Sequence, residues 1–312
     1  MNRREFTRAL GITAGALGLG QLSARGSKTT TQISLTMDDF HWGNSVRLSG
    51  TERNQAILKT LNNHRIKAAL FVVGRNIDSE EGKQMLREWD KAGHLIANHT
   101  YSHRNYANPA MTTTAYGEDI LRAESLLKEY SKFRKYFRYP MLKEGETVAK
   151  RDQLRAFLKN QGYRMGYVTI DNSDWIIDQR LIARVQENPA VDLKPYRDFY
   201  LEHMWDRAQY YDSLARKVLG RTIPHTLLTH FNLLNSLFLN DLIEMFKSKG
   251  WQWIDAETAL SDPVFSKAPL IIPAGESIVW AIAKENGTIA KSLRYPAEDG
   301  EYELGRMKKL GL

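Results

Sequence analysis

Short apolar runs alternate with amphipathic helical patterns along most of this chain. Apolar runs bounded by turn residues predict strands, and apolar residues three or four positions apart predict helices. Strands are expected at 32–37, 68–73, 93–98, 136–138, 164–170, 226–229 and 251–254, and helices at 51–64, 79–92, 112–130, 149–161 and 236–249. This alternation, repeated about seven times, predicts a parallel sheet closed into a barrel-like α/β domain with right-handed crossovers.

Two segments interrupt this rhythm. Residues 178–219 form a helix-rich stretch with breaks at Pro189 and Pro195, and we interpret it as an insertion. After residue 260 the alternation stops, and residues 261–312 are rich in turn residues. We therefore expect one catalytic domain at 32–260, followed by a C-terminal extension packed on it.

The first residues are predicted to be a targeting signal and not part of the fold. Arg3 and Arg4 are followed by Phe6, by an apolar run at 9–20 and by small residues before position 25. This resembles a twin-arginine export signal at 1–24, with a polar lead-in at 25–31. The run is shorter than the ~20 residues that span a bilayer. It predicts a bacterial periplasmic or secreted protein that uses the twin-arginine export machinery and has no stable membrane span when mature. The alternative is a short uncleaved anchor.

Composition narrows the possible chemistry. The chain has 312 residues, is 42% hydrophobic and carries a net charge of +8, but its basic residues are interspersed with acidic ones. Neither a basic block nor a nucleic-acid motif is present in the sequence, so we expect no nucleic-acid partner. The chain has no cysteine, so any bound metal needs nitrogen and oxygen ligands.

Polar residues that suit a metal site follow two of the expected strands. Asp38 and Asp39 come after the first strand, and His99 and His103 come after the third. Two imidazoles and one carboxylate are the ligands of an open catalytic zinc site, which leaves a position for water. Parallel barrels place their chemistry at the carboxyl ends of the strands. This pattern therefore predicts a hydrolase.

Arg138, Asp174 and His230 also follow expected strands directly or within a few residues. With these residues the chain resembles the NodB-homology polysaccharide deacetylases, carbohydrate esterase family 4, over about residues 32–260. Five motifs match in order: Thr-Met-Asp-Asp at 36–39, His-Thr-Tyr-Ser-His at 99–103, Arg-Tyr-Pro at 138–140, Asp-Asn-Ser-Asp-Trp at 171–175 and Leu-Thr-His at 228–230. The resemblance implies a distorted (β/α)7 barrel, in agreement with the periodicity.

The resemblance also implies roles for these residues. Asp39, His99 and His103 would hold a divalent metal, with Zn²⁺ expected first and Co²⁺ or another divalent ion as alternatives. Asp38 would be the general base and His230 the general acid. Arg138 would keep Asp38 ionised and oriented, and Asp174 would bond to His230 and raise its pKa.

Four further residues are candidates for contacts with the substrate or the oxyanion. The backbone N–H of Met141 is the expected oxyanion donor, although family members often place an aromatic residue at this position. Trp175 is expected to form a wall of the acetyl pocket. Tyr139 belongs to the third motif, and His41 lies two positions after Asp39 and could face the substrate.

The expected function is removal of N-acetyl groups from an amino-sugar polysaccharide or oligosaccharide. An O-acetyl esterase, for example on acetylxylan, would use the same residues and stays an alternative. A non-catalytic carbohydrate-binding protein is a lesser alternative, because such a protein would be expected to lose the base or the acid.

Overall fold

The computed structural model describes residues 30–297 and 300–312. The expected export signal and most of the expected lead-in lie outside the described residues. In the described part, no helix is both long and apolar enough to cross a membrane.

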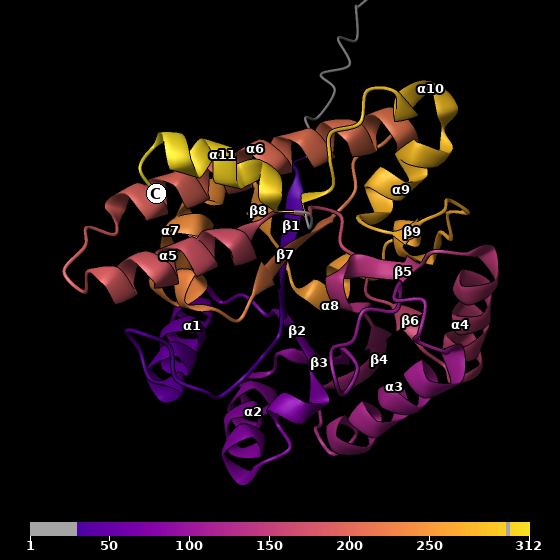
Figure 1. The fold of residues 1–312 in the computed structure, drawn as a ribbon, viewed down its shortest axis with the longest axis horizontal. Helices are drawn as coiled ribbons and strands as arrows, with labels where there is room; N and C mark the ends of the chain where they lie inside the picture. Colours follow the sequence, from indigo (N-terminus) through magenta and orange to yellow (C-terminus); the bar gives the residue numbers. More distant parts are fainter. Residues whose placement is uncertain (1–29, 298–299) are drawn as a thin grey trace, which may run out of the picture.

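A curved parallel sheet forms the centre of the molecule (Figure 1). Its strands lie in the order β6 (Arg164–Met165), β4 (Phe133–Phe137), β3 (Leu95–Asn98), β2 (Ala69–Val72), β1 (Gln32–Asp38) and β7 (His225–His230), with β8 (Gln252–Trp253) on β1. All of these pairings are parallel. The carboxyl ends of the strands therefore meet at one rim.

The segment that starts with β6 closes the barrel between β4 and β7. Its first residues pair with β4, and the N–H of Gly166 donates to the carbonyl of Phe137 at 2.8 Å. Four residues later, Ile170 forms a parallel bridge to Leu227 of β7. The expected strand at 164–170 is thus regular only over its first two residues, because the segment has to leave β4 and reach β7 within this length.

Helices surround the sheet. The outer helices of the barrel are α1 (Gly50–His64), α2 (Glu80–Ala92), α3 (Thr113–Leu127), α4 (Val148–Asn160) and α7 (Leu233–Ser248), with the short α8 (Ala256–Ala259) after β8. Three 3₁₀ turns lie at Gly74–Asn76, Pro140–Leu142 and Pro263–Ser266. The expected (β/α)7-type barrel is confirmed.

The expected insertion consists of α5 (Asp174–Glu187) and α6 (Lys194–Leu219). It begins four residues earlier than predicted, so Asp174 lies in the first turn of α5 and not in a strand end. Pro195 lies in the first turn of α6, where a missing N–H costs nothing.

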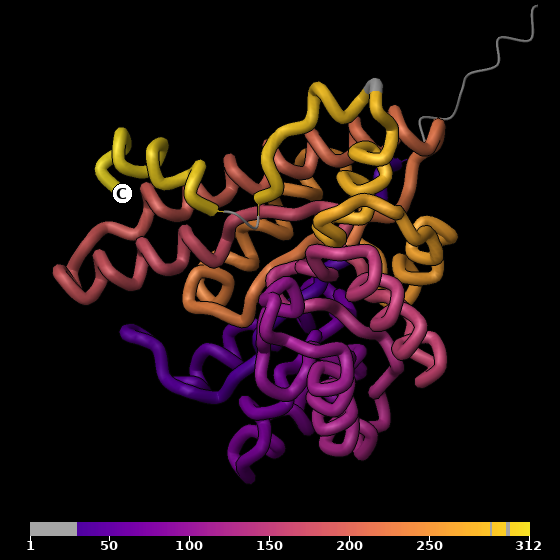
Figure 2. Tube along the Cα trace, turned by 45° about the vertical axis from the view of Figure 1, so that its right-hand side comes forward, coloured from indigo at the N-terminus to yellow at the C-terminus, as the bar shows by residue number. Residues whose placement is uncertain are grey.

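The C-terminal part adds β9 (Ala274–Gly275), α9 (Ile278–Glu285), α10 (Gly287–Ala290) and α11 (Glu301–Lys309). Strand β9 pairs antiparallel with β5 (Lys143–Gly145), while α9 packs on α6 and α11 on α5. In Figure 2 this last part of the chain, in yellow, lies over the two insertion helices.

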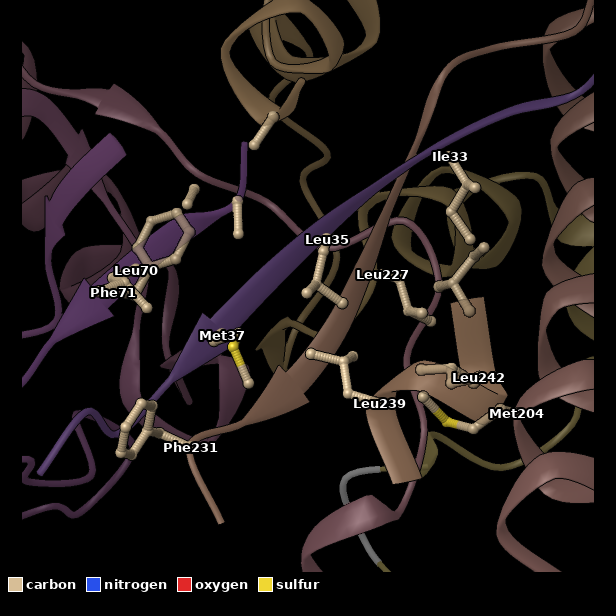
Figure 3. Packing of buried hydrophobic residues seen from close by; sticks show 14 of the residues in the cluster. Ile33, Leu35, Met37, Leu70, Phe71, Met204, Leu227, Phe231, Leu239 and Leu242 are labelled. Atoms are coloured by element: carbon tan, nitrogen blue, oxygen red, sulfur yellow. The ribbon is translucent and has the colours of Figure 1, made fainter. Parts of the chain in front are cut away.

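The alternation of side chains along β1 places apolar residues on the core side of the strand and polar residues of the site on the barrel side. Ile33, Leu35 and Met37 are fully buried and pack towards the helices together with residues such as Leu239 (Figure 3). Because successive side chains of a strand point to opposite faces, Thr36 points into the barrel, where its hydroxyl oxygen meets Arg138. The same parity places Asp38 in the barrel mouth.

Candidate active site

Three side chains at the rim converge as a metal-ligand set. One possible ligand atom from each of Asp39, His99 and His103 lies within 4.8 Å of the others. Oδ1 of Asp39 is 3.1 Å from Nε2 of His103 and 3.7 Å from Nε2 of His99. This spacing leaves room for a cation between the three side chains.

The electrostatics of these residues fit a divalent cation. Nδ1 of His99 lies 2.9 Å from the carbonyl oxygen of Arg138, and this bond fixes Nδ1 as the protonated nitrogen. The lone pair of Nε2 therefore faces Asp39, the arrangement of metal-binding histidines. Burial lowers the pKa of His99 to about 3, so the ring is neutral at pH 7. Oδ1 of Asp39 is shielded from solvent and accepts no hydrogen bond from the described residues.

The two histidines meet because the chain turns sharply between them, and not because they share a helix face. Thr100 and His103 both have left-handed backbone conformations, with φ of 65° and 53°. The N–H of His103 donates to Oγ1 of Thr100 at 2.9 Å, and the N–H of Thr100 donates to Oδ1 of Asn98 at 2.8 Å. Asp119 of α3 accepts from the N–H of Ser102 at 3.0 Å and from its hydroxyl at 2.8 Å. Such backbone strain persists only where surrounding contacts enforce it.

Asp38 forms a buried ion pair on the barrel side of this cluster. Nη1 of Arg138 is 2.6 Å from Oδ1 of Asp38 and 2.9 Å from Oγ1 of Thr36, and Nε donates to the carbonyl of Gly166 at 2.8 Å. Burial raises the pKa of Asp38 to about 6, against the opposing effect of the Arg138 guanidinium. A carboxylate with this pKa is ionised at pH 7 and can still accept a proton.

A second pair, His230 and Asp174, lies beside the Asp38–Arg138 pair. His230 is the register partner of Asp38 on the neighbouring parallel strand. Its Nδ1 is 2.6 Å from Oδ1 of Asp174, and its backbone N–H donates to Oδ2 of Asp174 at 2.9 Å. The side-chain amide of Asn235 donates to the same Oδ2 at 2.8 Å. Asp174 is therefore fully buried and held on both oxygens, so it orients the His230 ring.

Two hollows flank the site and form one open groove. They share five lining residues: Asp39, His103, Trp175, Gln179 and His230. The first hollow extends along His41, Arg75, Asn76, Asp178 and Asn232, and the second along Asn105, Met141, Lys143 and Leu228. A groove that continues on both sides of the ligand cluster suits an extended molecule.

The family model for polysaccharide deacetylases matches residues 25–166. This segment, a little under half of the chain, is thus similar to the polysaccharide deacetylase family.

Among individual relatives, a peptidoglycan-N-acetylglucosamine deacetylase of Bacillus cereus is 28% identical over 151 residues, which is 48% of each chain. This chain therefore aligns with about half the length of that relative. One similar solved structure is a mutant of a CE4 (carbohydrate esterase family 4) pseudoenzyme with restored enzymatic activity. Its TM-score is 0.51 at 17% identity, and the alignment covers 75% of this chain and 68% of the mutant's chain. The wild-type pseudoenzyme of Bacillus anthracis has a TM-score of 0.50 at 16% identity, with coverages of 75% and 66%. At these identities the two structures show a shared fold.

Most site residues predicted from the deacetylase motifs lie close together in the structure. The five motifs meet at one rim, and Met141, Trp175 and His41 all line the groove. Met141 adopts a left-handed conformation, with φ of 53°. The ring of His41 is held by Arg53, whose Nη2 also donates to the carbonyls of His41 and Gly43 at 3.0 and 2.8 Å.

Tyr139 is a correction to the predicted substrate contacts. Its ring is buried among Tyr106, Tyr116 and Phe137, and its exposed fraction is only 3%. It lines neither hollow of the groove. Because Arg138 points into the barrel, the next side chain of the segment must point away from it.

Two acidic residues of the site were missed by the sequence reasoning. Asp119 holds the loop between the two histidines, and Asp178 lines the groove one helical turn after Asp174. A helical period starting at Asp174 would have placed Asp178 on the same face. For Asp119 no comparable signal exists, since its contacts depend on how α3 packs beside the loop.

Proposed function

We propose that this chain is a metal-dependent hydrolase that removes N-acetyl groups from an amino-sugar polysaccharide or oligosaccharide outside the cytoplasm. The observation that carries this proposal is that Asp38 and His230 are register partners beside the Asp39–His99–His103 cluster. Each of the two has its own buried partner, Arg138 or Asp174. The name of the Bacillus cereus relative supports an N-acetylated sugar as substrate.

The chemistry follows from these positions. A divalent cation held by Asp39, His99 and His103 would polarise the acetyl carbonyl and allow water to attack at neutral pH. Asp38 takes the proton of the attacking water, and Arg138 keeps the Asp38 carboxylate oriented through the 2.6 Å contact. His230 then donates a proton to the leaving amine, while Asp174 stabilises the protonated ring.

Other groups of the groove complete the proposed site. The backbone N–H of Met141 is proposed to donate to the oxyanion, since Met141 lines the hollow beside the cluster. Trp175 and Leu228 line the same hollow and offer an apolar surface for the acetyl methyl group. Zinc as the resident ion, the twin-arginine signal at 1–24 and a periplasmic or secreted location complete the proposal.

The direct test is acetate release by the zinc-reconstituted protein from an N-acetylglucosamine oligomer and, in parallel, from an O-acetylated xylo-oligomer. Chelator-sensitive release from the first substrate alone is expected. Release from the second alone would identify an O-acetyl esterase instead. If neither substrate releases acetate while zinc is bound, the proposed function is wrong for both of these polymers.

Asp38→Asn provides the matching test of the base. The substitution keeps the shape of the side chain but removes the proton acceptor, so turnover should fall by at least about 10³-fold. Zinc should stay bound at one equivalent, because Asp39 and the two histidines are untouched. Activity within threefold of the wild type would refute the role of Asp38.

A further inference from the structure

The C-terminal segment reaches back to the motif that carries Asp174. The backbone N–H of Ala297 donates to Oδ2 of Asp171 at 2.7 Å, and the hydroxyl of Ser173 donates to the carbonyl of Ala297 at 2.7 Å. Ala297, Asp171 and Ser173 are all fully buried. Ser173 is the N-cap of α5, yet its side chain makes no capping bond within that helix. Its hydroxyl bonds to the C-terminal segment instead.

A second link runs from α11 through α6 to the same motif. Nε2 of His203 accepts the backbone N–H of Ser173 at 2.9 Å, and Nδ1 of the same ring lies 3.5 Å from Oε1 of Glu303. His203 and Glu303 are both buried, and Arg207 and Tyr295 also contact the Glu303 carboxylate. The start of α5 is therefore held by two separate parts of the C-terminal segment.

Gly300 of the C-terminal segment lies against the ring of Trp175, in the first turn of α5. Gly300 has a φ of 47°, and a Cβ at this position would lie 2.3 Å from Cζ2 and 2.9 Å from Cη2 of the Trp175 ring. Only a residue without a side chain allows this contact. The indole N–H of Trp175 is buried and has no hydrogen-bond partner among the described residues. Packing alone thus determines where the ring lies.

Trp175 lines both hollows of the groove, so its other side faces the proposed substrate. The ring lies between Gly300 and the space beside the Asp39–His103 pair. We infer that the C-terminal segment is a specificity element of the active site, in which Gly300 positions Trp175 and thereby sets the size of the acyl pocket. Gly300 acts through Trp175 and is a positioning residue. The inference rests on the proposed function, since it names what limits the acyl group in that same site.

The test compares Gly300→Ala with Gly305→Ala in the full chain. Gly305 lies five residues away in α11, and a Cβ there would meet nothing within 4 Å. The added methyl at 300 should push the indole into the pocket. We therefore expect kcat/KM on an N-acetylglucosamine oligomer to fall at least tenfold more than kcat/KM on the N-formyl oligomer, with no such change for Gly305→Ala.

A double-mutant cycle assigns the effect to the indole. In a Trp175→Phe background the ring atoms that the added methyl would meet are absent, so Gly300→Ala should no longer change the acetyl-to-formyl ratio. The near-ultraviolet circular dichroism should likewise differ between wild type and Gly300→Ala, but not in the Trp175→Phe background. This spectroscopic comparison needs neither metal nor turnover.

Each outcome decides the question. An unchanged acetyl-to-formyl ratio in Gly300→Ala, or equal effects of the two glycine substitutions on that ratio, would overturn the inference. If the wild type releases nothing from either oligomer, the proposed function fails and the spectra alone decide the placement of Trp175. If Gly300→Ala does not fold, Ser173→Ala takes its place. That variant removes the bond to Ala297 without adding bulk and should also change the ratio.

Discussion

Two adjacent carboxylates, Asp38 and Asp39, have different surroundings at the barrel rim. Asp38 ends β1 and points inwards to Arg138. Asp39 follows in a left-handed conformation, with φ of 61°, which turns its carboxylate towards the histidines. Burial would raise the pKa of Asp39, but His103 and His99 hold it below its ordinary value. The different neighbours therefore fit the two different roles proposed for these carboxylates, proton acceptor for Asp38 and metal ligand for Asp39.

Asp174→Asn tests the second pair at the same scale. Without the carboxylate, protonated His230 loses its anionic neighbour and its pKa should fall. The alkaline limb of the pH–rate profile should then move to lower pH, and kcat should fall by about 10²–10⁴-fold, as is typical when the carboxylate partner of a catalytic histidine is neutralised.

Asp212→Asn is the matched control for this prediction. Asp212 pairs with the buried His225 at 3.3 Å, and neither residue lines the groove. Asp212→Asn should leave the pH–rate profile unchanged. An alkaline limb at the same pH in Asp174→Asn would mean that His230 is not the acid.

At the scale of elements, α3 holds the loop that presents the two histidines. Asp119 accepts hydrogen bonds from the N–H and the hydroxyl of Ser102, the residue directly before His103. Asp119→Asn should weaken zinc binding by about 10–100-fold, the usual cost of losing a group that orients metal ligands. Competition with a metal indicator measures this affinity. Glu118→Gln, the exposed neighbour on α3, is the control, and equal affinities for the two variants would contradict the prediction.

Asp178 connects α5 with the start of α7, and it makes stability depend on pH. It is buried, and its Oδ1 accepts the N–H of Leu234 at 2.7 Å. Burial raises the pKa of Asp178 to about 7, so the folded protein retains a proton that the unfolded chain releases above about pH 4. The folded state thus binds more protons between these values, and this group lowers the stability as pH rises from about 4 to about 7.

Asp178→Asn should remove this pH-dependent loss of stability. At pH 8 the variant should be more stable than the wild type, by an amount on the order of 2 kcal/mol, and at pH 4 the two should be equal. Urea unfolding at both pH values measures the difference. A variant that is less stable at pH 8 would show that the ionised carboxylate is favourable in the folded protein.

For the molecule as a whole, the proposed cation would link distant parts of the chain. It would join the end of β1 to the loop after β3, and so it should stabilise the entire domain. Zinc at 1,000 times its Kd adds about 4 kcal/mol, which corresponds to a rise in Tm on the order of 10 °C. Removal of zinc with a chelator should reverse this rise.

Thermal unfolding of two histidine variants is the check. His103→Ala should lose the zinc-dependent rise in Tm, whereas His64→Ala, in the last turn of α1 and outside the groove, should keep it. A zinc-dependent rise of the same size in His103→Ala would place the stabilising ion elsewhere.

Much of this arrangement could be read from local patterns. A strand has a side-chain period of two, and its hydrogen bonds satisfy the backbone along its length, so apolar runs predict the strands well. The residue types at the strand ends also predicted a metal site there, and the resemblance to the deacetylases implied Asp39, His99 and His103 as its ligands; these three side chains do converge in the structure. Tyr139 was misplaced because its motif neighbour Arg138 points into the barrel and Tyr139 therefore cannot.

The order of the main strands and helices of the barrel, the alternation of faces in β1 and the five motifs could be read from the sequence, because each depends on residues close together in the chain. The short strand β5, the elements of the C-terminal part and the residues that support the site became clear only from the folded structure. Asp119, Asp178 and Gly300 act through partners brought near by packing, and Gly300 meets a ring that lies 125 positions earlier in the chain. Such contacts depend on how whole elements pack, and no local period encodes them.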